Sequence, residues 1–222
     1  TPEWKMRRFN QKWYLGETVI TGIGQGYTLV TPLQLAQATA ILANNGVAMR
    51  PHLVASVQGA SSGISRPVPI VTTDKISLKL ENIALVKQGM IGVTMPGGTA
   101  ASIGADSSYT IAAKTGTAQV IGVKQNEKYN ESKVNERHRD HALFIAYAPA
   151  EDPKIALAVI VENGGHGGSV AGPIARKIMD YYLLGKTPAP LIPIVPAATP
   201  EAGASPDLTP DLTNEGVEEP HD

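Results

Sequence analysis

The chain has 222 residues, a formal net charge of −1 and a hydrophobic fraction of 42 %. This composition is typical of a globular protein with a packed core, and the near-neutral charge argues against nucleic acid as the default partner. Cysteine is absent, which excludes disulfides and thiolate metal sites, and no apolar run reaches the roughly 18–20 residues that a transmembrane helix needs.

The first twenty residues mix basic and aromatic side chains and contain both tryptophans. Such interleaving can indicate nucleic-acid binding, but it is more typical of a surface segment whose rings pack on the body of the protein, and we expect that arrangement. The next glycine cluster, GIGQG (22–26), places its third glycine one residue too early for a dinucleotide-binding fingerprint. It predicts a tight turn.

One helix has clear boundary signals. Thr31 as N-cap, Pro32 at the first helical position and Gly46 beyond the end predict a helix over residues 32–45. Its alanine- and leucine-rich interior gives a broad apolar stripe that needs burial. Residues 47–72 follow as a connecting excursion to which we assign no chemistry.

A second helix is predicted over about residues 74–95, because apolar side chains recur there at helical spacing. The Pro-Gly-Gly sequence at 96–98 ends this helix, since neither residue type favours its continuation. Thr99–Ala101 is expected to open a further, short helix.

The next part of the chain predicts three strands and a last helix. The strands are YTIAAKTGTAQV (109–120), HALFIAYAPA (141–150) and KIALAVIVE (154–162), and the short link between the last two implies an antiparallel hairpin. A flexible glycine turn (163–168) leads to a helix over 169–184. These elements predict an α/β fold of the α+β sandwich type, with an antiparallel sheet flanked by helices.

Two segments have a different character. Residues 122–140 are strongly polar and predict a loop or an exposed helix. After Lys186 there is no lysine or arginine, and prolines and acidic residues dominate. Such a composition cannot bury enough apolar surface to offset its ordering entropy, so we expect a domain over 1–184 and a disordered tail over 185–222.

The sequence Lys114-Thr115-Gly116-Thr117 stands out in the first predicted strand, because Lys114 is its only full charge. Side chains alternate along a strand, which puts the hydroxyls of Thr115 and Thr117 on one face. Gly116 leaves room for a ligand or another backbone to approach. From spacing alone, an edge strand with a solvated lysine remains a good alternative.

Several segments resemble the C-terminal part of the transpeptidase domain of class B penicillin-binding proteins. The resemblance is strongest to the members of this family that are specific for cell elongation in rod-shaped bacteria. The segments are GIGQGY (22–27) with TPLQLAQA (31–38), KTGTAQV (114–120), ERHRDHALFIAYAP (136–149) and VIVENGG (159–165). The resemblance implies a penicillin-binding/β-lactamase-like fold. It also implies a peptidoglycan D,D-transpeptidase that works through a serine ester, without a cofactor or a metal.

The resemblance assigns roles to four residues. Lys114 would attract the substrate's terminal carboxylate and influence proton transfer at the serine, and the hydroxyls of Thr115 and Thr117 would bind that carboxylate. The Thr117 N–H would be one oxyanion donor, and Gly116 would let the substrate lie against the strand. The family's Ser-x-x-Lys and Ser-x-Asn motifs are absent. We expect both upstream of Thr1, together with a membrane anchor, and we expect this chain alone to be inactive.

The implied ligands are the peptidoglycan stem peptide ending in D-Ala-D-Ala and the β-lactams that mimic it. The implied partners are the upstream half of the same domain, a SEDS-family glycosyltransferase and other elongation-complex proteins, on the periplasmic side of the bacterial inner membrane. Two alternatives remain open: a non-catalytic scaffolding or binding domain, and a D,D-carboxypeptidase or β-lactamase-like hydrolase.

Two further patterns are weaker. His138, His141 and His166 could suggest a metal site, but no two of them have the i, i+4 spacing of helical metal ligands, so we predict none. The glycines at 164–168 could hold an anion through backbone N–H groups, although a plain flexible connection is the favoured interpretation. Asp140 and His141 are expected to anchor the start of a strand.

Overall fold

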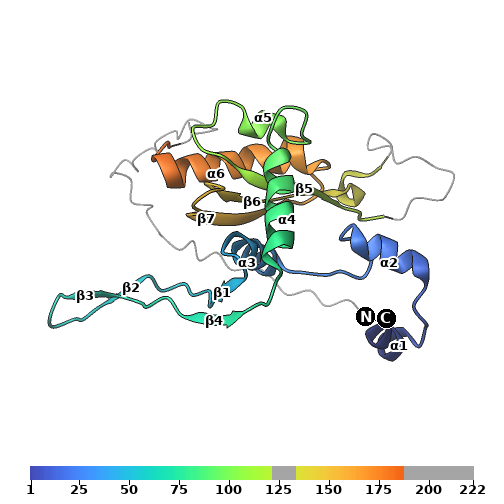
Figure 1. Cartoon of the computed structure of the whole chain (residues 1–222), viewed down its shortest axis with the longest axis horizontal. Coiled ribbons are helices and arrows are strands. Elements are labelled where there is room, and N and C mark those ends of the chain that lie inside the picture. Colours follow the sequence, from blue (N-terminus) through green and yellow to red (C-terminus); the bar gives the residue numbers. More distant parts are fainter. Residues whose placement is uncertain (122–133, 188–222) are drawn as a thin grey trace, which may run out of the picture. The chain divides into compact units, whose positions relative to one another are not determined.

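The computed structural model describes residues 1–121 and 134–187, which fall within one unit of the chain, Thr1–Pro188. A three-stranded antiparallel sheet organises this unit (Figure 1). Its strands follow the order of the chain: β5 (Ala112–Ala118), β6 (His141–Ala148) and β7 (Ile155–Val161). All three predicted strands and the hairpin are confirmed, each strand somewhat shorter than expected.

Helices cover both faces of this sheet (Figure 1). Helix α6 (Gly172–Leu184) packs on one face, and α3 (Pro32–Ala43) and α4 (Leu80–Gly92) pack on the other. Side chains alternate between the faces, so Phe144 of β6 packs towards α6 and Tyr147 packs towards α3 and α4; both are fully buried. The predicted sandwich of an antiparallel sheet between helices is confirmed.

The boundary signals of α3 work as expected. The Thr31 side chain accepts a hydrogen bond from the Gln34 N–H, and the Gln34 side chain accepts one from the Thr31 N–H. This reciprocal capping box satisfies two of the helix's unpaired donors. At the other end, Lys87 Nζ of α4 donates to Ala43 O and to Asn45 Oδ1, each at 2.7 Å. A cation at a helix C-terminus stabilises its unpaired carbonyls.

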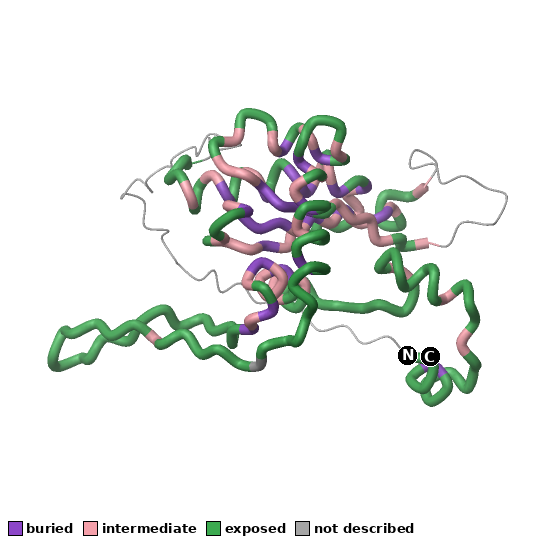
Figure 2. Tube along the Cα trace, viewed as in Figure 1, coloured by how far each residue is buried: buried purple, intermediate pink, exposed green. Residues whose placement is uncertain are grey.

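The excursion predicted over 47–72 is a two-stranded antiparallel ribbon. Strand β1 (Val47–Met49) pairs with β4 (Thr72–Lys75), and β2 (Ser56–Gln58) pairs with β3 (Ser65–Pro67). The strand-like sequence VASVQG (54–59) contains β2, but the other three strands were missed because they are three or four residues long and carry little alternation of apolar and polar side chains. Figure 2 shows the ribbon exposed along nearly all of its length.

The prediction that the second helix starts near residue 74 is wrong, because α4 begins at Leu80. Residues 72–75 are strand β4, whose β-branched Thr72 and Thr73 suit an extended backbone. The pairing partner of this strand, Val47–Met49, lies far back in the sequence, so no local pattern separates the strand from the helix that follows.

The N-terminal segment forms two short helices, α1 (Pro2–Phe9) and α2 (Leu15–Gly22). Its aromatic rings gather around Tyr27, with ring centroids of Trp4 and Phe9 each 5.5 Å away. Lys5 is 1 % exposed beneath them and is paired with Glu17. The rings pack on one another and on Tyr27, and Trp4 and Phe9 remain 37 % and 46 % exposed, so the predicted packing on the body of the protein is not confirmed. The expected glycine turn begins after Gly22, with positive φ at Gly24 and Gly26.

Three smaller elements complete the unit. The predicted short helix is α5 (Ala101–Gly104), and a 3-10 turn, Glu136–His138, precedes β6. The last helix starts at Gly172 rather than at residue 169, because a π-helical turn, Gly167–Ala171, comes first.

Parts of two predictions fall outside the described residues. They are most of the polar segment 122–140 and nearly all of the tail 185–222, which therefore stays a prediction together with the domain boundary at 184. No helix within 1–121 or 134–187 is long and apolar enough to cross a bilayer.

Candidate active site

Strand β5 is at one edge of its sheet, with β6 on its other side. Two carbonyls of β5 and that of Ile111, the residue before it, accept hydrogen bonds from side chains. Ile111 O accepts from Thr94 Oγ1 at 2.7 Å, Thr115 O accepts from Lys114 Nζ at 2.7 Å, and Thr117 O accepts from Gln25 Nε2 at 3.3 Å. The three acceptors, at positions 111, 115 and 117, are separated by even numbers of residues. Every second residue of the strand therefore directs its backbone C=O away from β6.

In an antiparallel strand, the N–H and C=O of one residue point to the same side. The amide N–H groups of Thr115 and Thr117 therefore face away from β6, along the open edge. Gly116 and Lys114 turn their backbone groups towards β6, where they pair with Leu143 and Ile145. The edge thus offers backbone donors at the two threonines that the sequence singled out.

The two threonine side chains share one face of β5, as predicted from the period of a strand. They line a hollow together with Thr99, His166 and Ser169. Thr99 Oγ1 is 3.4 Å from Thr115 Oγ1, within reach of a hydrogen bond. Hydroxyl groups from three elements therefore meet at this end of the strand.

The Lys114 side chain is exposed, and its ammonium bends back to the Thr115 carbonyl at the open edge. Positive charge, hydroxyl groups and outward N–H groups are thus concentrated within four consecutive residues. Such a combination can hold a carboxylate and, beside it, stabilise negative charge that develops on a carbonyl oxygen.

Two glycines allow the backbone of the site to pack closely. A Cβ on Gly116 would be 3.2 Å from the Leu143 Cβ. A Cβ on Gly167 would be only 2.0 Å from Leu143 O and 2.5 Å from Gly116 O. The predicted flexible turn at 163–168 therefore needs correction, because Gly167 is buried directly against β5 and β6.

Two residues of the site were not predicted from the sequence. Gln25, from the turn between α2 and α3, bonds to the Thr117 carbonyl although the two residues are 92 positions apart. Thr99 meets Thr115 from the turn between α4 and α5. The signal for Gln25 was the glycine cluster around it, and in the structure Gly24 and Gly26 have positive φ on either side of this half-buried residue. No comparable signal marks Thr99.

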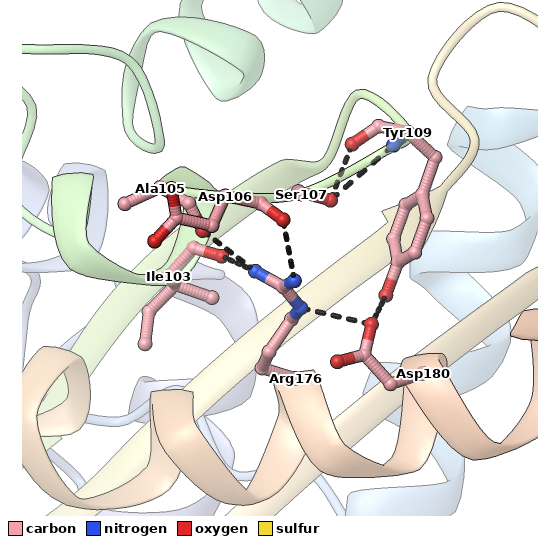
Figure 3. A network of polar contacts seen from close by, with 7 residues as sticks. All are labelled: Ile103, Ala105, Asp106, Ser107, Tyr109, Arg176 and Asp180. Atoms are coloured by element: carbon pink, nitrogen blue, oxygen red, sulfur yellow. Dashed lines mark hydrogen bonds and ion pairs between the residues drawn. The ribbon is translucent and has the colours of Figure 1, made fainter. Parts of the chain in front are cut away.

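The start of β5 is anchored by a polar network (Figure 3). Tyr109 donates its hydroxyl proton to Asp180 Oδ1 at 2.6 Å, and Arg176 Nε donates to the same oxygen at 2.9 Å. The guanidinium also reaches Ile103 O at 2.7 Å. Burial, followed by the bond to Asp180, raises the pKa of Tyr109. Burial acts to raise the pKa of Asp180, but bonds from Tyr109 and Arg176 outweigh it and lower that pKa.

The histidines play local roles. His141 Nδ1 accepts from the Asn163 N–H at 2.9 Å, and Asp140 O accepts from the Gly165 N–H at 2.8 Å, which anchors the start of β6 as predicted. In the described part of the chain, no three histidine or acidic side chains come together as a metal site would require.

A family model described as the penicillin binding protein transpeptidase domain matches residues 7–180. The chain belongs to this family. The family predicted from the motifs is confirmed, and so is the penicillin-binding transpeptidase fold.

Named relatives of this transpeptidase family agree. The peptidoglycan D,D-transpeptidase MrdA of Haemophilus influenzae is 44 % identical over 191 residues, which cover 85 % of this chain and 29 % of the relative. PbpA of Mycobacterium tuberculosis, also named a peptidoglycan D,D-transpeptidase, is 36 % identical over 174 residues, covering 75 % of this chain and 32 % of that protein. The chain thus spans about a third or less of these relatives.

Two solved structures of penicillin-binding proteins share the fold. Pseudomonas aeruginosa PBP2 in complex with WCK 5153 superposes with a TM-score of 0.66 at 44 % identity, covering 85 % of this chain and 39 % of that one. Helicobacter pylori PBP2 in complex with MreC superposes with a TM-score of 0.63 at 33 % identity, covering 83 % and 30 %.

Proposed function

We propose that this chain is the Lys-Thr-Gly-Thr part of a serine D,D-transpeptidase that cross-links peptidoglycan stem peptides. The single observation that carries the proposal is the open edge of β5, where Lys114 and the outward amides of Thr115 and Thr117 meet. Family membership supports the same reaction, because relatives at 44 % identity are named D,D-transpeptidases.

The reaction is acyl transfer in two steps. A serine hydroxyl attacks the carbonyl of the penultimate D-alanine, its proton passes to a base, and the terminal D-alanine leaves as the amine. An amine of a second stem peptide then attacks the ester and releases the serine. Residues 1–222 hold no Ser-x-x-Lys, so this nucleophile would come from a polypeptide segment beyond them.

Each residue of the β5 edge has a place in that reaction. Lys114 attracts the terminal carboxylate, and the hydroxyls of Thr115 and Thr117 donate hydrogen bonds to it. The Thr117 N–H donates to the oxyanion that forms on the attacked carbonyl. Gly116 keeps the edge free of a side chain where the extended substrate lies along it. A β-lactam presents the same carboxylate and carbonyl and would acylate the same serine.

The proposed setting is the periplasmic side of the inner membrane, within the cell-elongation machinery. The H. pylori PBP2 structure with MreC supports a partner of this kind. A SEDS-family glycosyltransferase is the second proposed partner, from the resemblance to elongation-specific members of the family.

Labelling with a fluorescent penicillin tests the proposal. The full-length protein that carries this chain should be labelled, and residues 1–222 expressed alone should not form a stable acyl-enzyme. An intact parent protein that stays unlabelled would favour a non-catalytic scaffolding domain. Product analysis with a peptide donor and an added amine then separates cross-linking from a carboxypeptidase or β-lactamase-like hydrolysis.

A further inference from the structure

The ribbon of β1–β4 has no role in the proposed reaction, yet most of its residues are exposed. Every residue of β2 and β3 is exposed (Figure 2). Large apolar side chains on it are more than half exposed: Leu53, Val54, Val57, Ile64 and Ile70. A two-stranded hairpin is marginally stable in water unless further strands or a partner cover it.

Backbone hydrogen bonds define which groups of the ribbon face outwards. The Val68 N–H donates to Ala55 O at 2.9 Å, and the Gly59 N–H donates to Ile64 O at 3.2 Å. Alternate residues of β2 therefore point towards β3. The backbone N–H and C=O of Ser56, which lies between these positions, point away from β3 to the free edge.

The two edges of the ribbon differ in what they can bind. The β2 edge presents Ser56 and Gln58, both with an N–H that faces outwards. The β3 edge presents Ser65, Pro67 and Pro69 at its outward positions, by the same alternation. Proline has no N–H, so the β3 edge cannot donate to an added strand at two of these three positions. The β2 edge keeps its outward N–H groups at both Ser56 and Gln58 and is the better one to receive a strand.

The charge of the ribbon indicates the chemistry of the occupant. Its sequence from 46 to 76 contains Arg50, Arg66 and Lys75 against a single acidic residue, Asp74. Like charges on neighbouring strands destabilise their pairing, and opposite charges stabilise it. Arg66 pairs with Val57 and shares its face, so that face combines an exposed apolar surface with a cation.

We propose that the β2 edge, Val54–Gln58, is a docking site for an extended acidic peptide. The peptide adds a third strand through backbone hydrogen bonds to Ser56 and Gln58, a known mode of peptide recognition. Its apolar residues lie on the face of Val57, and its carboxylates pair with Arg66 on that face. Charge disfavours a second copy of the chain in this place, because that would bring two cationic ribbons together.

A pair of serine variants tests the edge specifically. Ser56→Pro removes the outward N–H of the open edge, and Ser65→Pro makes the same change at an outward position of the edge that two prolines already block. The probe is a fluorescein-labelled eight-residue peptide of alternating valine and glutamate, measured by fluorescence anisotropy on the full-length protein. Ser56→Pro should weaken binding by about tenfold or more, and Ser65→Pro should leave it unchanged.

Two peptide controls need no change in the protein. Replacing glutamate by lysine in the probe should abolish binding, and so should N-methylation of alternate backbone nitrogens. Equal weakening by the two serine variants, or no binding by the wild type, would overturn the proposal. The proposal would also be overturned if the wild type buries the whole ribbon by forming a concentration-dependent dimer, and Ser56→Pro leaves this dimer intact. The same holds if binding to phosphatidylglycerol vesicles buries the ribbon and Ser56→Pro does not change that binding.

Discussion

The β5 edge and the β2 edge both face outwards, and they differ in what lies behind them. The β5 edge belongs to a sheet whose two faces are covered by helices, and Ala112 and Ala113 of β5 are fully buried. The β2 edge belongs to a ribbon whose residues are exposed on both faces. An edge that takes part in catalysis, as proposed for β5, needs hydrogen-bond donors that are fixed before the substrate arrives. An edge that binds a peptide, as proposed for β2, can become ordered when its ligand binds.

Removing the support behind the β5 edge should have the largest effect, because this edge depends on its packing and the β2 edge does not. Gly167→Ala places a Cβ 2.0 Å from Leu143 O, so the turn must move off the sheet. We expect a loss of about 3 kcal/mol or more in the free energy of unfolding, measured by urea denaturation. Gly89→Ala is the control, because it sits in α4 with open space around it. That variant should be neutral or slightly more stable, and an equally mild Gly167→Ala would contradict the packing argument.

The second prediction separates the chemistry of the β5 edge from its stability. Under the proposed function, Lys114→Ala in the full-length protein should lower the rate of acylation by penicillin about 100-fold, because the ammonium assigned to charge stabilisation in the transition state would be lost. Its unfolding midpoint should not move, since the side chain is exposed. Lys154→Ala, which removes half of an exposed ion pair with Asp152, should change neither quantity. Unchanged acylation in Lys114→Ala would remove Lys114 from the site.

The third prediction concerns the anchor at the start of β5. Asp180→Asn removes a carboxylate that accepts from both Tyr109 and Arg176, and should cost about 1–3 kcal/mol of stability at pH 7. The pKa of Asp180 is lowered from 3.8 in the folded state, so its contribution is complete above that value and is lost as the pH falls below it. Wild type should therefore lose more stability than Asp180→Asn between pH 5 and pH 3. Asp152→Asn, on the surface, should behave as wild type.

The smallest effect is expected at Thr99. Thr99→Val removes the hydroxyl that meets Thr115 Oγ1 at 3.4 Å, and should slow acylation about fivefold by freeing the Thr115 hydroxyl to turn away. The loss should appear in the concentration of penicillin needed for half-maximal acylation rate rather than in the unfolding midpoint. Thr99→Ser should restore it, and a serine variant as slow as the valine variant would point to packing instead.

Local signals were sufficient for part of this fold. The capping box at Thr31 and the prolines and glycines around α3 are read within a few residues of chain, and the apolar runs of β6 and β7 needed no knowledge of their partners. The start of α4 was predicted wrongly because it depends on a segment that is distant in the sequence. Whether Thr72–Lys75 is helix or strand depends on Val47–Met49, with which it pairs.

The candidate site divides in the same way. The strand period placed the Thr115 and Thr117 hydroxyls on one face, and the structure bears out that placement. The contact of Gln25 with Thr117 joins positions 92 apart, and Gly167 owes its close packing to a sheet formed by distant segments. Such neighbours are fixed by tertiary packing, which no local pattern encodes.

The bond from Lys114 Nζ to the Thr115 carbonyl also has an entropic consequence. A lysine side chain that swings freely loses about 1.5–2 kcal/mol of rotamer freedom when it is fixed. Here a 2.7 Å bond to the neighbouring residue already restrains the four-carbon chain, with two ammonium protons left over. An anion that arrives at the β5 edge meets a tethered charge, so less disorder has to be removed for it to bind.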